Sequence, residues 1–200
     1  MTKSASSLAK KTKKSLTDKT LETFLKGRVQ VLVGDITRQA VDALVNAANS
    51  SLMGGGGVDG AIHRAGGEAI LEECRKIRST IYPEGLPTGE AVITTGGLLP
   101  ARHVIHTVGP IYGNHAGQEA SLLAACYRNS LRLAALHALS SVAFPAISTG
   151  VFGYPKAEAA QVSSGAIKAF LENDDKLEEV RLVFFKPDDA KLFLKHHGFG

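Results

Sequence analysis

The 200-residue sequence contains no tryptophan, only two cysteines and no long apolar run. Cys74 and Cys126 lie far apart and belong to no Cys-x-x-Cys or His-x-x-x-His pattern, which argues against a disulfide framework and a zinc site. No segment approaches the ~20 apolar residues that cross a bilayer, and the N-terminus lacks the apolar block of a secretory signal. We therefore expect a cytoplasmic protein with no membrane contact and no metal or other cofactor.

Positive charge is concentrated at the N-terminus. Residues 1–28 hold eight lysines and arginines against Asp18 and Glu22, whereas the remaining 172 residues hold fifteen basic and seventeen acidic side chains. The basic character therefore belongs to the N-terminal segment, and the rest of the chain does not have the charge typical of a nucleic-acid-binding domain. We expect residues 1–14 to form a solubilising, partly disordered arm, with weak polyanion binding or organelle targeting as alternatives.

A helix is predicted directly after the arm. Ser15-Leu16-Thr17-Asp18 has the form of a capping box, and Leu21, Phe24 and Leu25 form an approximate apolar stripe that ends at Gly27. Residues 15–200 are then expected to form one domain.

Short apolar runs alternate with helix-like segments along the rest of the chain, which predicts a three-layer α/β/α sandwich around a mixed sheet of about six strands. Most runs are apolar at successive positions, as in strands that are buried on both faces. The expected strands are 29–33, 43–45, 91–94, 104–108, 142–147 and 180–185, and the expected helices are 59–77 with a break at Gly66-Gly67, 118–139, 156–171 and 188–197.

Three polar loops follow predicted strands, at residues 34–37, 46–49 and 148–154. In open α/β sheets, ligands bind beyond the carboxyl ends of the strands. Taken singly, Asp35 could be a helix cap, and Asn46 and Asn49 could be turn residues. Their common position at the end of a strand instead favours a shared ligand site.

Four consecutive glycines, Gly54 to Gly57, precede the helix that is predicted to begin near Asp59. The sequence formally matches a dinucleotide-binding fingerprint, but it does not follow a strand directly and no acidic strand end comes ~20 residues later. Glycines let a backbone approach a ligand closely, and a helix N-terminus attracts anions. We prefer an anion-binding loop to a flexible connector, because ordering four glycines costs substantial conformational entropy.

The loop from Ser148 to Tyr154 has two interpretations. Ala146-x-Ser148-x-Gly150 is one residue from a nucleophile elbow, with later acidic residues and His196 or His197 as partners. Because Ala146 replaces the first elbow glycine and the chain is small for that fold, we prefer a loop whose backbone amides bind phosphate.

In order along the chain, Gly34-Asp35-Ile36-Thr37, Asn46-Ala47-Ala48-Asn49, Gly54 to Ile62 and Ser148 to Pro155 resemble the macrodomain family, and more narrowly its MacroD-type ADP-ribosyl hydrolases. Pro87 to Ala91 and His106 to Pro110 also resemble that branch. The resemblance covers about residues 29–195. It implies that the chain binds ADP-ribose and ADP-ribosylated proteins, with ADP-ribosylated nucleic-acid ends as a further class of partner. We expect the protein to be a monomer.

The resemblance also implies roles for individual residues. Asp35 and Ile36 would bind adenine, Asn49 the distal ribose, and Asp59 would assist hydrolysis. Phe152 would pack on the distal ribose, where some members carry a tyrosine. The implied catalytic residues are Asp59 and Asn49, and the implied substrate-binding residues are Asp35, Ile36, Asn46, Gly56, Gly57, Val58, Ser148, Thr149, Gly150, Val151 and Phe152.

We therefore expect a metal-independent hydrolase that removes mono-ADP-ribose from acidic side chains and deacetylates O-acetyl-ADP-ribose. A non-catalytic reader of ADP-ribose is the first alternative and a Ser148 hydrolase the second. Whether Asp59 or a substrate phosphate accepts the proton stays open. His63 is either a neighbour of the site or a buried structural residue, and His103 and His106 are expected on opposite faces of their strand, so that they cannot bind one metal.

Overall fold

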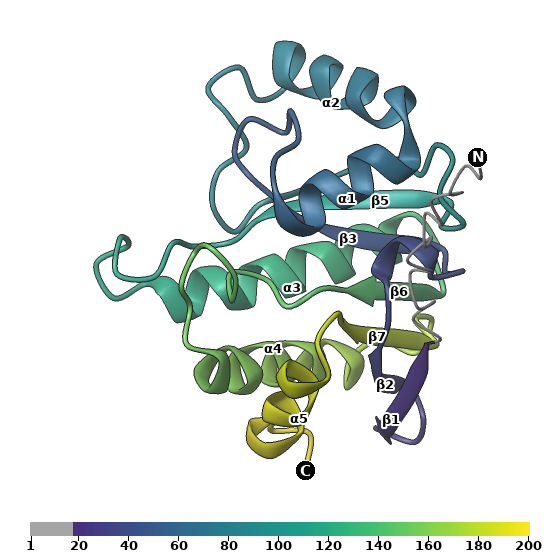
Figure 1. Cartoon of the computed structure of the whole chain (residues 1–200), viewed down its shortest axis with the longest axis vertical. Helices are drawn as coiled ribbons and strands as arrows, with labels where there is room; N and C mark the ends of the chain where they lie inside the picture. The colour runs from purple at the N-terminus through teal and green to yellow at the C-terminus, as the bar shows by residue number, and fades with distance from the viewer. Residues whose placement is uncertain (1–17) are drawn as a thin grey trace, which may run out of the picture.

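The computed structural model describes residues 18–200, so the predicted arm at 1–14 lies outside the described residues. The described chain forms one seven-stranded sheet with the order β1-β2-β7-β6-β3-β5-β4. The five inner strands are parallel, and β1 and β4 are antiparallel edge strands (Figure 1). The strands are β1 (Lys19–Phe24), β2 (Val29–Val33), β3 (Ala43–Ala48), β4 (Ala91–Thr95), β5 (His103–Val108), β6 (Ser141–Phe144) and β7 (Glu179–Phe184).

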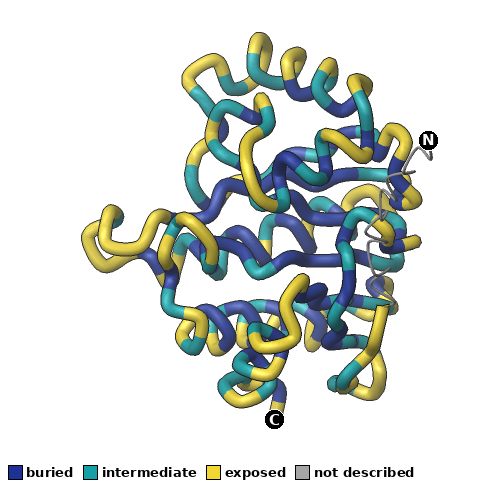
Figure 2. Tube along the Cα trace, viewed as in Figure 1, coloured by how far each residue is buried: buried dark blue, intermediate teal, exposed yellow. Residues whose placement is uncertain are grey.

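Helices cover both faces of this sheet, as predicted for a three-layer sandwich. On one face lie α1 (Gly57–Gly66) and α2 (Glu68–Thr80), and on the other lie α3 (Glu119–Leu136), α4 (Lys156–Leu171) and α5 (Pro187–His196). Successive residues of β3 alternate between the two apolar cores: Val45 packs toward α3 to α5, and Leu44 packs toward α1 and α2. Burial on both faces explains the continuous apolar runs, and Figure 2 shows the strands as the most buried part of the chain.

The prediction of a helix over residues 15–27 is wrong for its described part, because residues 19–24 form β1. This strand pairs antiparallel with β2, and Leu25, Lys26 and Gly27 turn the chain with φ values of 51°, 59° and 89°. The apolar spacing reflects burial in a different element, since Leu21, Phe24 and Leu25 pack against the core beneath α3 to α5. Pairing with β2 satisfies backbone groups that a helix would leave exposed on the edge of the sheet.

Arg28, at the start of β2, ties the edge of the sheet to the end of α4. Its guanidinium donates hydrogen bonds to the carbonyl oxygens of Leu171 at 2.9 Å, Asp174 at 2.6 Å and Leu177 at 2.7 Å. Leu171 is the last residue of α4, and the last carbonyls of a helix have no partner within it. Asp174 and Leu177 lie in the segment after α4, so Arg28 holds both the helix end and the chain that follows it.

Both cysteines are free and buried, Cys74 in α2 and Cys126 in α3. Within residues 18–200, no helix combines the length and the apolar character needed to span a bilayer.

Candidate active site

The loops that follow β2, β3 and β6 meet the N-terminus of α1 at the carboxyl edge of the sheet, around a pocket of about 550 Å³. The structure therefore brings together segments that are more than a hundred residues apart in sequence. Six of the residues predicted to bind substrate line this pocket: Asp35, Ile36, Gly57, Val58, Thr149 and Gly150.

Asp35 lies at one end of the pocket and also caps the short 3-10 helix η1 (Ile36–Arg38). Its Oδ1 accepts hydrogen bonds from Thr37 N at 3.0 Å and from Thr37 Oγ1 at 2.7 Å. The alternative of a helix cap is thus correct as far as Oδ1 is concerned. Within the described chain no donor bonds to Oδ2, which therefore has its lone pairs available to a ligand.

The backbone around the pocket is shaped to present N–H groups. Gly56 is the N-cap residue of α1 and supplies no side chain to its amides, and Gly57 has φ of 59°. Ser148 has φ of 63°, a left-handed conformation that is rare for a residue with a side chain and is concentrated at functional sites. Successive amides in such a conformation form an anion-binding concavity.

The Ser148 hydroxyl does not have the environment of a nucleophile. Its Oγ is buried, has no hydrogen-bond partner within residues 18–200, and lies so close to Gly109 that a Cβ there would overlap it. A serine nucleophile needs an adjacent base. This geometry favours the phosphate-binding loop over the Ser148 hydrolase.

Asn46, Asn49 and Asp59 meet beside the pocket, as their implied roles require. Asp59 is 4% exposed in the first turn of α1, where the helix dipole stabilises a carboxylate. Its Oδ1 accepts a hydrogen bond from Asn46 Nδ2 at 2.7 Å, and its Oδ2 lies 3.5 Å from Asn49 Nδ2. Asn49 Nδ2 also donates to Gly54 O at 3.0 Å, which fixes the start of the glycine loop against the same side chain.

Two glycines are required by this close packing. A Cβ at Gly55 would lie 3.1 Å from Asp59 Oδ2 and 3.2 Å from Asn49 Nδ2, and a Cβ at Gly60 would overlap the backbone of Gly55. The glycine loop is therefore packed on the carboxylate and is not a free connector.

His63 lies one helical turn after Asp59, and its Nε2 is 3.4 Å from Asp59 Oδ1. This nitrogen is buried and forms no hydrogen bond within the described chain. Of the two alternatives for His63, the structure supports a neighbour of the site. The signal in the sequence is the i, i+4 spacing from an acidic residue in the first turn of a helix.

A deeper cluster was not foreseen from the sequence. Potential ligand atoms of His63, Cys74 and His106 lie within 4.8 Å of one another. Burial lowers the pKa of His106 to about 3, so its ring is neutral, and burial raises the pKa of the Cys74 thiol to about 12. His106 is completely buried and His103 is not, in agreement with the prediction that they face opposite sides of β5.

The hydrogen bonds of His106 decide what this cluster can do. Asn46 Nδ2 bonds to the Asp59 carboxylate and must be a donor, so His106 Nδ1, 3.1 Å from it, accepts. The ring proton then lies on Nε2 and is donated to Thr94 Oγ1 at 2.9 Å. With its proton on Nε2, the His106 ring supports Asn46 through Nδ1 and thereby the hydrogen bond from Asn46 to Asp59.

The loop that carries Phe152 is held in place by contacts with Tyr112, in the segment between β5 and α3. Tyr112 N donates to Phe152 O at 2.9 Å, and the rings of Tyr112 and Tyr154 meet edge to face at 5.0 Å. Phe152 is half-buried and Val151 is fully exposed, so Val151 has only its backbone to offer a bound molecule.

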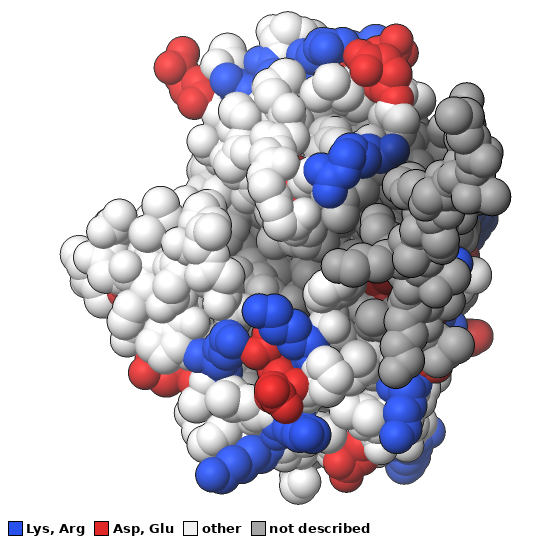
Figure 3. All heavy atoms as spheres, viewed as in Figure 1, with Lys and Arg blue, Asp and Glu red and all other residues white. Residues whose placement is uncertain are grey.

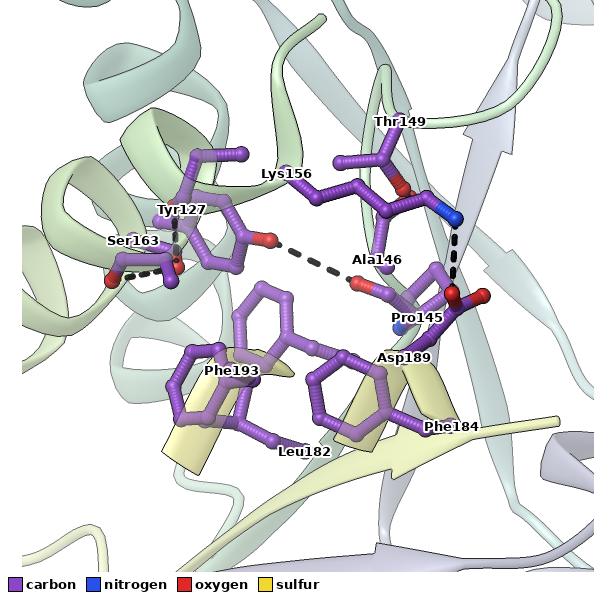
Figure 4. Close-up of a pocket in the computed structure, with 13 residues that line it drawn as sticks. Tyr127, Pro145, Ala146, Thr149, Lys156, Ser163, Leu182, Phe184, Asp189 and Phe193 are labelled. Atoms are coloured by element: carbon purple, nitrogen blue, oxygen red, sulfur yellow. Dashed lines mark hydrogen bonds and ion pairs between the residues drawn. The ribbon is translucent and has the colours of Figure 1, made fainter. Parts of the chain in front are cut away.

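Lysines and an aspartate that were not among the predicted site residues line one wall of the pocket. Lys156, Lys186 and Asp189 come from the N-terminal ends of α4 and α5, and Lys156 Nζ lies 2.6 Å from Asp189 Oδ1 (Figure 4). Figure 3 shows basic and acidic side chains side by side in the lower half of this face. The exposed Phe185 adds an aromatic ring to the same wall.

Comparisons with known proteins agree with this geometry. A family model described as Macro domain matches residues 45–163. An O-acetyl-ADP-ribose deacetylase of Escherichia coli K12 is 51% identical over 169 residues, which are 84% of this chain and 94% of that protein. The Oceanobacillus iheyensis macrodomain solved with ADP is 43% identical, with a TM-score of 0.83 over 90% of this chain and 94% of that one. The Trypanosoma brucei macrodomain in complex with ADP-ribose is 40% identical, with a TM-score of 0.77 over 84% of this chain and 68% of that one.

Proposed function

This chain belongs to the macrodomain family, and we propose that it binds ADP-ribose and hydrolyses ester bonds at the distal ribose, as a deacetylase of O-acetyl-ADP-ribose and a hydrolase of mono-ADP-ribosylated acidic side chains. The substrates in the names of its relatives support the first activity. The second is proposed for the same site, because both substrates carry an ester on that ribose.

The proposed orientation places adenine against Asp35 and Ile36. The diphosphate lies between two amide-rich loops, the glycine loop at residues 54–57 and the loop at residues 148–154. One of these loops contains Gly56 and the other contains Ser148, and the N-terminus of α1 adds its dipole to the attraction for the phosphates. The distal ribose then lies beside Asn49 and Asp59, with Phe152 packed over it.

The observation that carries the proposal is the buried carboxylate of Asp59 next to a pocket that is lined by glycine-rich loops and by the N-terminus of α1. A protein that only binds ADP-ribose gains nothing from a negative charge in this position, because it repels the phosphates. Asn46 and Asn49 hold the carboxylate in place, so the site keeps a charge that opposes binding. A role in the reaction explains that arrangement.

In the proposed reaction on a modified acidic side chain, a water beside Asp59 attacks C1″ of the distal ribose while the carboxylate departs with the bonding electrons. The water proton passes to Asp59 or to the substrate phosphate. On O-acetyl-ADP-ribose the same water attacks the acetyl carbonyl and the bond from that carbon to the ribose oxygen breaks. The ribose oxygen takes up a proton to become a hydroxyl, and acetate is released. The proposed acceleration comes from positioning of the water and from base assistance, and the proposal invokes no metal.

The proposal also covers the protein's location, its oligomeric state and the classes of its substrates. We place the protein in the cytoplasm as a monomer that acts on ADP-ribosylated proteins, with ADP-ribosylated nucleic-acid ends as a second class of substrate. The near balance of charge beyond residue 28 favours protein targets over nucleic acid.

The test is single-turnover hydrolysis of O-acetyl-ADP-ribose and of a carboxylate-linked mono-ADP-ribosylated protein, measured beside ADP-ribose binding on the same preparations. Asp59→Ala should slow hydrolysis by ~10²- to 10⁴-fold and keep or improve affinity. Asn49→Ala should lower both, because it removes a ribose contact as well as the alignment of Asp59.

Asp188→Asn is a suitable control, since that carboxylate is 92% exposed. Normal turnover by Asp59→Ala would refute its catalytic role. Tight binding without turnover by the unmodified protein would instead identify a reader of ADP-ribose.

A further inference from the structure

The wall of the pocket carries an ion pair, Lys156 with Asp189, that the proposed reaction does not use. Asp35 marks the adenine end, and the two amide-rich loops mark the diphosphate end. ADP-ribose joins these two groups through the ribose of its adenosine, so this ribose must lie between the ends. Lys156 and Asp189 line the same pocket, and Figure 4 shows their ion pair near Thr149, which also lines it.

Both side chains project from the beginning of a helix. Lys156 is the first residue of α4, and Asp189 lies in the first turn of α5. Lys156 Nζ contacts Asp189 Oδ1 at 2.6 Å, with 44% and 30% of the two side chains exposed. The lysine therefore fixes one carboxylate oxygen, and the carboxylate stays accessible from the pocket.

We infer that Asp189 accepts a hydrogen bond from the 2′-hydroxyl of the adenosine ribose and thereby selects ligands in which this hydroxyl is free. The inference rests on the proposed function, because the orientation of ADP-ribose places the ribose there. Dinucleotide-binding folds use an acidic residue in the same way, to bind the ribose hydroxyl of NAD, and accommodate a 2′-phosphate with arginine instead. Ligands with a phosphate at the 2′-oxygen, or with a chain extended through it, would be rejected.

Lys186 also lines this wall, and two lysines alone would suit an extra phosphate. The charge of Lys156 is already matched by Asp189, however, and a phosphate here would face the carboxylate at close range. Like charges in such a position oppose binding. The geometry thus favours a ligand with a 2′-hydroxyl over one with a 2′-phosphate. Lys156 weakens the repulsion between the Asp189 carboxylate and such a phosphate only in part.

The experiment measures calorimetric affinities of the full chain for ADP-ribose and for ADP-ribose 2′-phosphate. The unmodified protein should prefer ADP-ribose by tenfold or more. Asp189→Asn keeps an oxygen acceptor and removes the charge, so the preference should fall to within about threefold. Lys156→Gln removes the neutralising partner, so the preference should increase. A purely structural role for the pair would not move the preference in opposite directions.

Asp188→Asn is the matched control, one residue away and 92% exposed, and it should leave the preference unchanged. Equal affinity of the unmodified protein for both ligands, or an unchanged preference in Asp189→Asn, would overturn the inference and leave the proposed function intact. Failure of the unmodified protein to bind ADP-ribose at all would refute the proposed function and the inference together.

Discussion

Asp35 serves local structure and the proposed ligand site through different oxygen atoms. Replacement by alanine should weaken ADP-ribose binding by roughly 10- to 150-fold, the equivalent of a charged hydrogen bond worth ~1.5–3 kcal/mol. It should also lower the free energy of unfolding by about 1 kcal/mol, because the N-cap of η1 is lost.

A serine at the same position separates the two effects. Asp35→Ser keeps a capping oxygen, so stability should recover while affinity stays low. Calorimetry and denaturant unfolding on both variants check this expectation. Unaltered affinity in Asp35→Ala would leave Asp35 as a helix cap only.

His106 should make the free energy of unfolding depend on pH between about pH 3 and pH 6.5. Its pKa is lowered to about 3 by burial, whereas an unfolded histidine titrates near 6.5. Between these values the unfolded chain binds one proton more than the folded chain, so stability is lost as pH falls. The expected slope is about 1.4 kcal/mol per pH unit, or about 2 kcal/mol between pH 6.5 and 5.

Urea unfolding at a series of pH values measures this slope, and His106→Gln should flatten it. His103→Gln is the matched control on the same strand and should keep it. Asp42 does not interfere: although burial opposes the shift, hydrogen bonds from Ser140 and Arg102 hold its pKa below the usual range, so its contribution is lost only under stronger acid. An identical slope in His106→Gln would show that the ring is protonated in the folded state as well.

At the scale of secondary-structure elements, Arg28 joins the start of β2 to the carbonyl of Leu171 at the end of α4 and to two carbonyls in the segment that follows. Arg28→Lys keeps the charge but loses the planar fork that reaches them, and the free energy of unfolding should fall by about 2 kcal/mol. ADP-ribose affinity should not change, because Arg28 is not among the residues lining the pocket.

Denaturant unfolding of this variant is best compared with Arg75→Lys. Arg75 pairs with Glu68 on the surface, with more than half of each side chain exposed, and such pairs contribute little. Equal effects of the two substitutions would contradict the role given to Arg28.

The inner strands could be predicted from sequence because burial on both faces leaves a local signature, as in Val29 to Val33. The edge strand β1 could not. Leu21, Phe24 and Leu25 have spacings that suit one face of a helix, and only the presence of β2 as a partner makes the extended form better. A short, half-exposed edge strand is specified by what it pairs with, and this information is not local.

Some residues of the candidate site could likewise be predicted from the sequence, and others could not. Asp35, Asn49, Asp59 and the glycine loop could be identified because they follow predicted strands or begin a predicted helix. The contact between Cys74 and His106 depends on how α2 lies over β5, at a sequence distance of 32 residues. Alternation along a strand shows which face His106 occupies but not which side chains meet it there.

At the scale of the whole molecule, the basic N-terminal segment should be dispensable for chemistry. Deleting residues 1–14 leaves every residue of the sheet and the pocket in place, so hydrolysis should stay within a few-fold of the full chain. A loss beyond about tenfold, which corresponds to ~1.4 kcal/mol, would show that the segment contributes to the site.

Deleting residues 1–24 is the informative contrast. That deletion removes β1 and leaves the edge of β2 unpaired, so the shorter protein should unfold at lower denaturant concentration and aggregate more readily. Equal stability of the two truncated proteins would mean that β1 adds nothing to the sheet.

The start of the described chain also bears on how the protein can be labelled or immobilised. Asp18 Oδ2 accepts a hydrogen bond from Gln39 Nε2 at 2.8 Å, and the same carboxylate lies against Gly34, next to Asp35 in the pocket. A fluorophore or surface linker attached at residue 18 would therefore sit beside the adenine end and could compete with ligand. Phe199, by contrast, stacks on Phe24 in the core under α5, away from the pocket. An attachment after Gly200 thus leaves the binding face open, and sensors of ADP-ribose built on this domain should be anchored there.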